Sequence, residues 1–190
     1  MQLVTNTMPD HEVLRRPARE IVFPVDSQVK QFLHEMQEFF ANLKSPFGKP
    51  AGLAATQVGM PWRVIIIQVP PEAKQVRKDV YDTLPPTFII NPVYIPNVDE
   101  GKTKDWEGCY SVPDKMGEVY RYTSIQYSGY APDGKKIEGI AKGFLARLIQ
   151  HEVGHLNGEL YTDLLCDDCR FGLVDVMLKI RQSEMQQIRS

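Results

Sequence analysis

The chain has 190 residues, of which 43% are hydrophobic and 24% are charged, which is ordinary for a globular protein. This length predicts a single domain over residues 1–190. A net charge of −2 argues against direct nucleic-acid readout, and no apolar run approaches the ~18 residues of a membrane span. The N-terminal segment lacks a hydrophobic signal core, so we expect a cytoplasmic protein rather than an exported or organelle-imported one.

The first expected helix covers residues 26–44, where apolar side chains recur at helical spacing behind Asp26 or Ser27 as the N-cap. A continuous β-branched run at 63–70 predicts a buried strand. Residues 71–86 are polar and interrupted by prolines, which predicts an inserted loop with one helical turn.

Further strands are expected at 87–90, 92–95 and 118–130, the last from its alternating pattern. A turn at 131–135 leads toward a second amphipathic helix, and the chain is expected to end with a helix over 171–188. Strands and helices occur in blocks rather than in strict alternation, which predicts the α+β class.

Residues 150–158, QHEVGHLNG, carry the strongest functional signal. The preceding segment 143–150 has the apolar stripe of a half-buried helix, so His151 and His155 would lie one turn apart on the same face. Two imidazoles at this spacing can hold one divalent metal ion, with Glu152 placed for acid–base chemistry. The alternative is a helix whose histidines merely share a face.

Cys109, in EGCYS, is the candidate third ligand, because catalytic metal sites commonly take three protein ligands. A lone cysteine is also a common small core residue. Cys166 and Cys169 form a CDDC pair that could bind metal or act in redox chemistry. Asp167 and Asp168 would raise rather than lower the thiol pKa values, so we leave the pair out of the site and expect no disulfide framework.

Three segments now stand in a recognisable order: GLAATQ at 52–57, EGCYS at 107–111 and QHEVGHLNG at 150–158. Together they resemble the peptide deformylases, over roughly residues 8–165. The resemblance implies an α+β domain with antiparallel β-sheets packed around a central HExxH metal-binding helix, plus a C-terminal helix. It also implies a hydrolase that removes the formyl group from the N-terminal formyl-methionine of newly made polypeptides and releases formate.

By this resemblance, three side chains would bind one divalent metal ion: Cys109, His151 and His155. The metal would be Fe(II) in the cell, with zinc, nickel or cobalt able to replace it. Glu152 would be the general acid/base, and Gln57 with the backbone N–H of Tyr110 would hold the oxyanion. These roles suit formamide hydrolysis, because a metal lowers the pKa of bound water and a developing oxyanion needs preorganised donors.

The substrate would be a nascent formyl-Met polypeptide, expected near the ribosome exit, and its first side chain needs an apolar slot. The candidates for this slot are Ala51, Leu53, Phe144 and Leu148, and Gly52 would let the peptide backbone approach closely. We expect Glu107 to orient His151 and Arg121 to neutralise Glu107, the alternative being two surface charges. Arg147, one turn before His151, is either a residue of the pocket rim or part of a solvated helix face.

Two positions depart from the family pattern. Pro50 replaces a glycine ahead of the first motif and stiffens that loop. Gly154 replaces the aspartate that precedes the second histidine, which removes a carboxylate and weakens the helix by about 1 kcal/mol relative to alanine. If the carboxylate is simply lost, Gly154→Asp should tighten metal binding; if neighbours have repacked around the glycine, it should destabilise the fold.

Two other functions remain as alternatives. An HExxH metalloendopeptidase would use the same helix, but it normally takes a third ligand downstream, and the other histidines, His11 and His34, lie upstream. A non-catalytic binder is motivated by Pro50 and Gly154. Formate release from a formyl-Met peptide, compared with cleavage of an unstructured protein, separates these functions.

Overall fold

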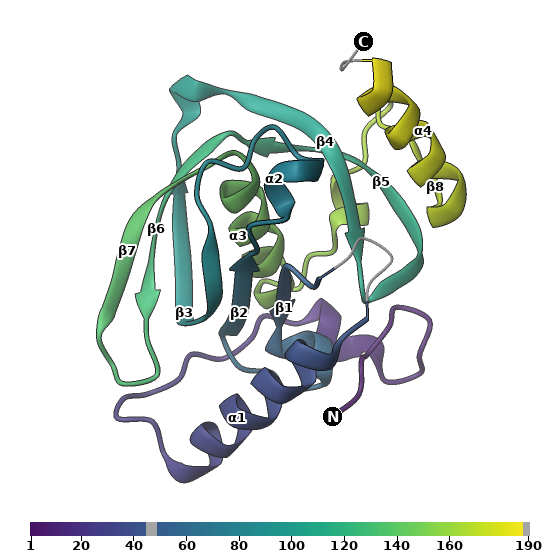
Figure 1. Cartoon of the computed structure of the whole chain (residues 1–190). Coiled ribbons are helices and arrows are strands. Elements are labelled where there is room, and N and C mark those ends of the chain that lie inside the picture. The colour runs from purple at the N-terminus through teal and green to yellow at the C-terminus, as the bar shows by residue number, and fades with distance from the viewer. Residues whose placement is uncertain (45–48, 188–190) are drawn as a thin grey trace.

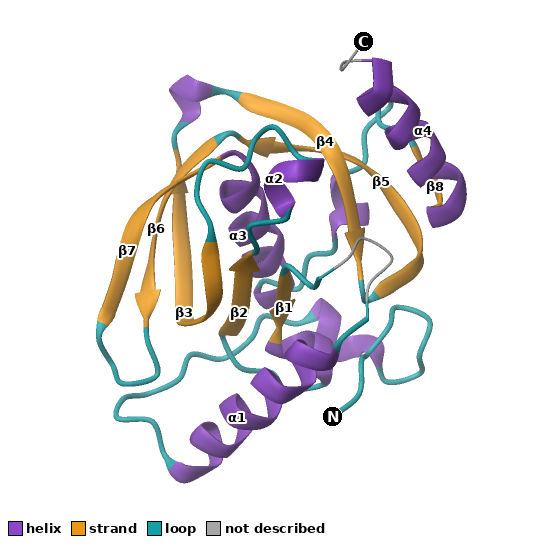
Figure 2. Ribbon diagram, in the orientation of Figure 1, coloured by secondary structure: helices purple, strands orange, loops and turns teal. Residues whose placement is uncertain are grey.

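Two antiparallel sheets enclose a central helix in the computed structural model, which describes residues 1–44 and 49–187 (Figure 1). The elements in chain order are α1 (Ser27–Asn42), β1 (Gly52–Ala54), β2 (Val64–Val69), α2 (Ala73–Val76), β3 (Leu84–Pro96), β4 (Lys102–Cys109), β5 (Val112–Tyr122), β6 (Ser124–Tyr130), β7 (Lys136–Lys142), α3 (Gly143–Leu156), β8 (Phe171–Leu173) and α4 (Val174–Gln187). Within the described residues, one sheet has the order β1-β2-β3-β6-β7 and the other the order β4-β5-β8. Figure 2 shows α3 between the sheets and α4 beside β8.

The strand β2 is buried on both faces, as the β-branched run predicts. Ile65 and Ile67 pack in the core that contains the apolar side chains of α3, whereas Val64 and Ile66 pack in the core against α1. Successive side chains of a strand point to opposite faces, so β2 separates the two helices and holds α3 on the inner side of its sheet.

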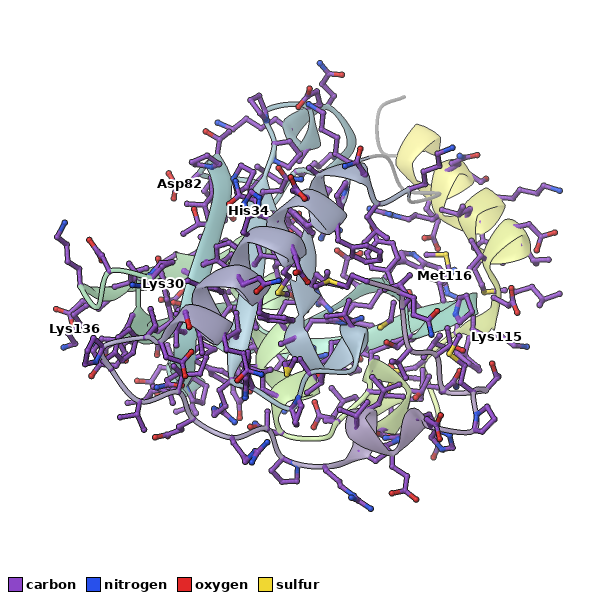
Figure 3. The ribbon with its side chains drawn as sticks, turned by 90° about the horizontal axis from the view of Figure 1, so that it is seen from below. Lys30, His34, Asp82, Lys115, Met116 and Lys136 are labelled. Carbon is purple, nitrogen blue, oxygen red and sulfur yellow. A yellow bond between two sulfur atoms is a disulfide. The ribbon has the colours of Figure 1, made fainter. Side chains whose placement is uncertain are left out.

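The helix α1 begins where its capping residue predicts. The Asp26 side chain accepts a hydrogen bond of 2.8 Å from the backbone N–H of Val29, which satisfies a donor of the first turn. Met36, on the inner face of the helix, is fully buried. Lys30 and His34 lie on its outer surface (Figure 3), and the His34 side chain is 74% exposed.

Two stretches of strand differ from the sequence prediction. The strands expected at 87–90 and 92–95 are the single strand β3, whose register shifts around Asn91, a residue with a φ of 50°. The strand expected at 118–130 is instead β5 followed by β6, with a break at Thr123. Both differences reflect local irregularities that alternation of side chains does not reveal.

Three strands are not predicted by the sequence pattern: β1, β4 and β7. β4 is rich in charged residues, and its exposed end carries Lys102 and Lys104, so its apolar pattern is weak. Its register is set by pairing with β5, from Lys102↔Tyr122 to Gly108↔Met116. Figure 3 shows Lys115 and Met116 on β5 at the α4 end of the molecule, far from Lys136 at the start of β7.

The expected C-terminal helix begins later than predicted, because residues 171–173 pair with β5 as β8 before α4 starts. The predicted end of that helix, residue 188, lies outside the described residues. Within the part of the chain that the structure describes, no helix is long and apolar enough to cross a membrane. The predicted α+β class is confirmed, with antiparallel sheets around a central HExxH helix and a helix near the C-terminus.

Candidate active site

The three sequence motifs meet in one cavity of about 700 Å³ beside α3. β1 and the 3-10 helix at Ala55–Val58 bring the first motif, the end of β4 brings the second, and α3 brings the third. Residues from all three motifs line the cavity, namely Gly52, Gln57, Glu107, Gly108, Cys109, Tyr110, His151 and Glu152. Segments far apart in the sequence therefore share a single site.

Cys109, His151 and His155 bring three ligand atoms together. Nε2 of His155 lies 3.2 Å from Sγ of Cys109 and 3.2 Å from Nε2 of His151, and all three atoms lie within 4.8 Å of one another. Metal–ligand bonds of ~2.0–2.3 Å place tetrahedral ligands at about this separation. A thiolate with two imidazoles suits zinc or iron. These residues therefore fit one divalent ion with an open coordination position.

The His155 imidazole is fully enclosed. Burial lowers its pKa well below the ordinary value, so the ring is neutral and offers a lone pair to a metal. Its Nδ1 has no hydrogen-bond partner among the described residues. Nδ1 is the nitrogen that must carry the proton if Nε2 is the ligand.

Glu107 orients the other histidine. Its Oε2 lies 2.8 Å from Nδ1 of His151, while Arg121 donates to both carboxylate oxygens at 3.0 Å. Burial alone would raise the pKa of Glu107, but Arg121 and His151 hold it well below its ordinary value. Burial lowers the pKa of His151, yet its contacts with Cys109 and Glu107 raise it to about 10. A metal ion at Nε2 must therefore displace a proton.

Arg147 lies inside the site rather than on a solvated helix face. It is 4% exposed, and its Nη1 donates to Oε1 of Glu107 at 2.7 Å. It also donates to the carbonyl oxygens of Val119 (3.1 Å) and Thr103 (2.7 Å). Two guanidinium groups thus bind one carboxylate, an arrangement that helical spacing alone does not predict.

Glu152 lies against the backbone of β1. A Cβ atom at Gly52 would come within 2.8 Å of the Glu152 carboxyl carbon and of Leu148 Cδ1, so any other residue here would have to move Glu152 or Leu148. Oε2 of Glu152 is buried without a hydrogen-bond partner among the described residues. Burial raises the pKa of Glu152 to about 7, which suits a group that accepts and donates a proton near neutrality.

Gln57 presents its amide NH₂ to the metal-ligand cluster. Its Oε1 accepts from the backbone N–H of Ala54 at 2.9 Å, which directs Nε2 toward Cys109 Sγ (3.4 Å) and Ser111 Oγ (3.3 Å). Tyr110 lines the same cavity. Both residues predicted to supply oxyanion donors therefore line the cavity, Gln57 in contact with Cys109 Sγ and Tyr110 next to Cys109 in the chain.

Most of the predicted slot residues line the cavity: Ala51, Gly52, Phe144 and Leu148. Leu53 does not; it is fully buried in the core against α1, because its side chain points to the opposite face of β1. The prediction for Leu53 is corrected accordingly.

The loop between β2 and β3 also contributes to the slot. The Arg77 guanidinium lies 4.4 Å from the ring centroid of Phe144 and is held by Asp79 and Asp105. The sequence analysis missed Arg77, because residues 71–86 carry no motif and their polarity suggests solvent exposure.

Tyr161 was a further omission. Its ring stacks on His151 with centroids 6.2 Å apart, and its hydroxyl is buried without a hydrogen-bond partner among the described residues. Cys166 and Cys169 form a disulfide with a sequence separation of 3, although no disulfide framework was expected from the sequence. Neither cysteine lines the cavity.

Comparison with known proteins gives a consistent result. The model of the polypeptide deformylase family matches residues 5–170. Peptide deformylase 2 of Rickettsia conorii is 34% identical over 189 residues, which cover 98% of this chain and 91% of the relative. Peptide deformylase 2 of Pseudomonas syringae pv. tomato is 43% identical over 126 residues, covering 66% and 68% of the two chains. The crystal structure of peptide deformylase from Ehrlichia chaffeensis superimposes with a TM-score of 0.72 at 31% identity, over 88% of each chain.

Proposed function

The chain belongs to the polypeptide deformylase family, and we propose that Cys109, His151 and His155 bind the divalent metal ion on which its activity depends. It is a metal-dependent hydrolase that removes the formyl group from the N-terminal formyl-methionine of newly made polypeptides. The observation that best supports the ligand assignment is the pair of 3.2 Å separations that join the three ligand atoms. We assign Fe(II) as the metal in the cell, with zinc, nickel or cobalt as substitutes.

When bound, the metal ion supplies a water molecule of lowered pKa at neutral pH. Glu152 would take a proton from the attacking water and return it to the departing amine, a role that its pKa of about 7 supports. The Gln57 amide and the Tyr110 backbone N–H donate to the oxygen on which negative charge develops. Glu107 holds His151 in the tautomer that leaves Nε2 free for the metal.

The substrate enters beside β1, which is the edge strand of its sheet. An extended peptide can hydrogen-bond to such an edge while its first side chain fills the slot lined by Ala51, Gly52, Phe144 and Leu148. In this proposal the enzyme meets nascent chains in the cytoplasm, near the ribosome exit.

The deciding experiment measures formate release from a formyl-Met peptide by anaerobically prepared Fe(II) protein. Glu152→Gln should keep its metal and lose most turnover, because the water loses its proton acceptor. Glu138→Gln is the matched control, since Glu138 is exposed and pairs with Lys136 on the surface. Cleavage of an unstructured protein without formate release would instead identify an endopeptidase, and metal binding without either activity would identify a binder.

A further inference from the structure

The helix α3 ends in a cap that folds the chain back over its last turn. Gly158 has a φ of 83°, and its N–H donates to the carbonyl of His155 at 3.2 Å. The N–H of Glu159 donates to the carbonyl of Gly154 at 2.9 Å. These bonds make a Schellman motif, in which the second residue beyond the cap packs against the third-last residue of the helix. The Glu159 side chain is therefore brought over Gly154.

The Glu159 carboxylate occupies the space that a side chain at position 154 would need. A Cβ atom at Gly154 would lie 2.9 Å from Oε1 of Glu159, closer than such atoms approach in proteins. The same Oε1 lies 3.5 Å from Nη1 of Arg121. The missing side chain at 154 thus lets a carboxylate from beyond the helix reach a buried arginine.

The contact between Glu159 and Arg121 helps to balance the charge of the buried cluster. Arg121 and Arg147 both bind Glu107, so the buried cluster contains two cations for one anion. A buried charge is costly unless it is paired. Glu159, whose side chain is 38% exposed, adds a second anion at the outer end of the cluster.

We propose that Glu159 is a positioning residue of the metal site, which acts through Arg121 and Glu107 on His151. Nη1 of Arg121 donates to Oε1 of Glu159. Nε and Nη2 of the same guanidinium donate to the Glu107 carboxylate. Glu107 in turn fixes Nδ1 of His151. The contacts run without a gap from a partly exposed glutamate to a metal ligand. The inference rests on the proposed function for the identity of His151 as a ligand.

The first test measures zinc affinity of the full chain by competition with a chelator. Glu159→Gln and Glu159→Ala should each weaken binding about 10-fold, the lower end of the loss typical for partners of metal ligands. The visible spectrum of the Co(II) protein should also change, because His151 is held less firmly. Glu138→Gln serves as the control. Wild-type zinc affinity in both Glu159 variants would overturn the proposal.

The second test exchanges the position of the carboxylate. Gly154→Asp alone should weaken zinc binding, because its side chain displaces Glu159 from Arg121. In the double variant Gly154→Asp/Glu159→Ala, the aspartate starts from the vacated space and can reach Arg121, so zinc affinity should exceed that of either single variant. A double variant no tighter than Glu159→Ala would refute the proposal.

The two tests also separate this inference from the proposed function. Zinc affinity and the Co(II) spectrum do not depend on turnover. If the wild-type protein released no formate while positions 154 and 159 remained coupled, the proposed function would fail and the positioning role would stand. If formate were released but the coupling were absent, only the positioning role would fail. If Glu159 only stabilised the helix cap, its substitution would lower the melting temperature of the chelator-treated protein and leave zinc affinity unchanged. That result would also refute the positioning role.

Discussion

Oε2 of Glu107 lies 2.8 Å from Nδ1 of His151, and both side chains are largely buried. The contact decides which ring nitrogen of His151 can bind a metal, because the hydrogen-bonded Nδ1 keeps its proton and Nε2 is the nitrogen that gives its proton up. Nε2 of His151 then lies 3.2 Å from Nε2 of His155, and the ligand atoms of both histidines and Cys109 lie within 4.8 Å of one another. A single carboxylate thereby joins the charge cluster of β4 and β5 to the proposed metal ligands of α3.

The first prediction concerns this carboxylate. Glu107→Gln should weaken metal binding by about 10–100-fold, the loss typical when the partner of a ligating histidine is changed. It also removes the only carboxylate that binds Arg147 in the cluster and leaves Arg121 with Glu159 alone, so the free energy of unfolding should fall by about 3–5 kcal/mol. Chelator competition and urea unfolding measure the two effects. Unchanged metal affinity would mean that His151 does not need Glu107.

The second prediction tests the oxyanion donor. Gln57→Ala should lower kcat by about 10²–10³-fold, because one preorganised donor is lost. The bound metal should remain at one equivalent, since Gln57 contacts Cys109 only through a long 3.4 Å hydrogen bond. Steady-state kinetics and elemental analysis on the same preparation measure both quantities. Loss of metal in step with activity would show that Gln57 supports the ligand instead.

The third prediction concerns the buried arginine of α3. Arg147→Lys keeps the charge but cannot serve Glu107, Thr103 and Val119 together. Carbonyl oxygens left without a donor should lower the free energy of unfolding by about 1–3 kcal/mol. Arg16→Lys is the control, because the Arg16 side chain is 73% exposed. Equal urea midpoints for the two variants would contradict the role of the guanidinium fork.

The local parts of the site could be predicted from the sequence, whereas its supporting contacts could not. His151, Glu152 and His155 follow from helical spacing, which depends on neighbours within one turn. Arg147 lies on the same helix, but its burial depends on carbonyl groups of β4 and β5, and the sequence does not reveal that pairing. Glu159 contacts Arg121 only because the cap reverses the chain over Gly154.

The same limit applies to the fold. β2 could be predicted because its side chains are apolar on both faces, so burial can be inferred without knowing the partners. The residues of β4 do not alternate clearly between apolar and polar side chains. This strand is defined by its backbone pairing with β5, which the sequence does not show. The register between them brings Glu107 and Arg121 into the same cluster, a contact between residues 14 apart in the sequence.

A further charge pair attaches the C-terminal segment to the smaller sheet. Arg170 Nε donates to Oε2 of Glu118 at 2.8 Å, and Nη2 donates to Oε1 at 2.6 Å. The backbone N–H of Arg170 also donates to Oε2, at 3.1 Å. Glu118 belongs to β5 and Arg170 immediately precedes β8, so the pair holds β8 and the start of α4 against β5.

The last prediction is that this attachment weakens in acid. The hydrogen bonds from Arg170 hold the pKa of Glu118 below its ordinary value of 4.5. Stability from this depressed pKa is fully present above the unfolded-state pKa and is lost as pH falls through the lower, folded-state pKa. Glu118→Gln should therefore lower the melting temperature at about pH 7, and by a smaller amount at about pH 3, below the ordinary pKa of 4.5. All samples contain chelator, so that metal release does not contribute. Glu138→Gln, on an exposed pair, should change little at either pH. An equal loss for Glu118→Gln at both pH values would show that its packing, rather than its charge, holds β8 in place.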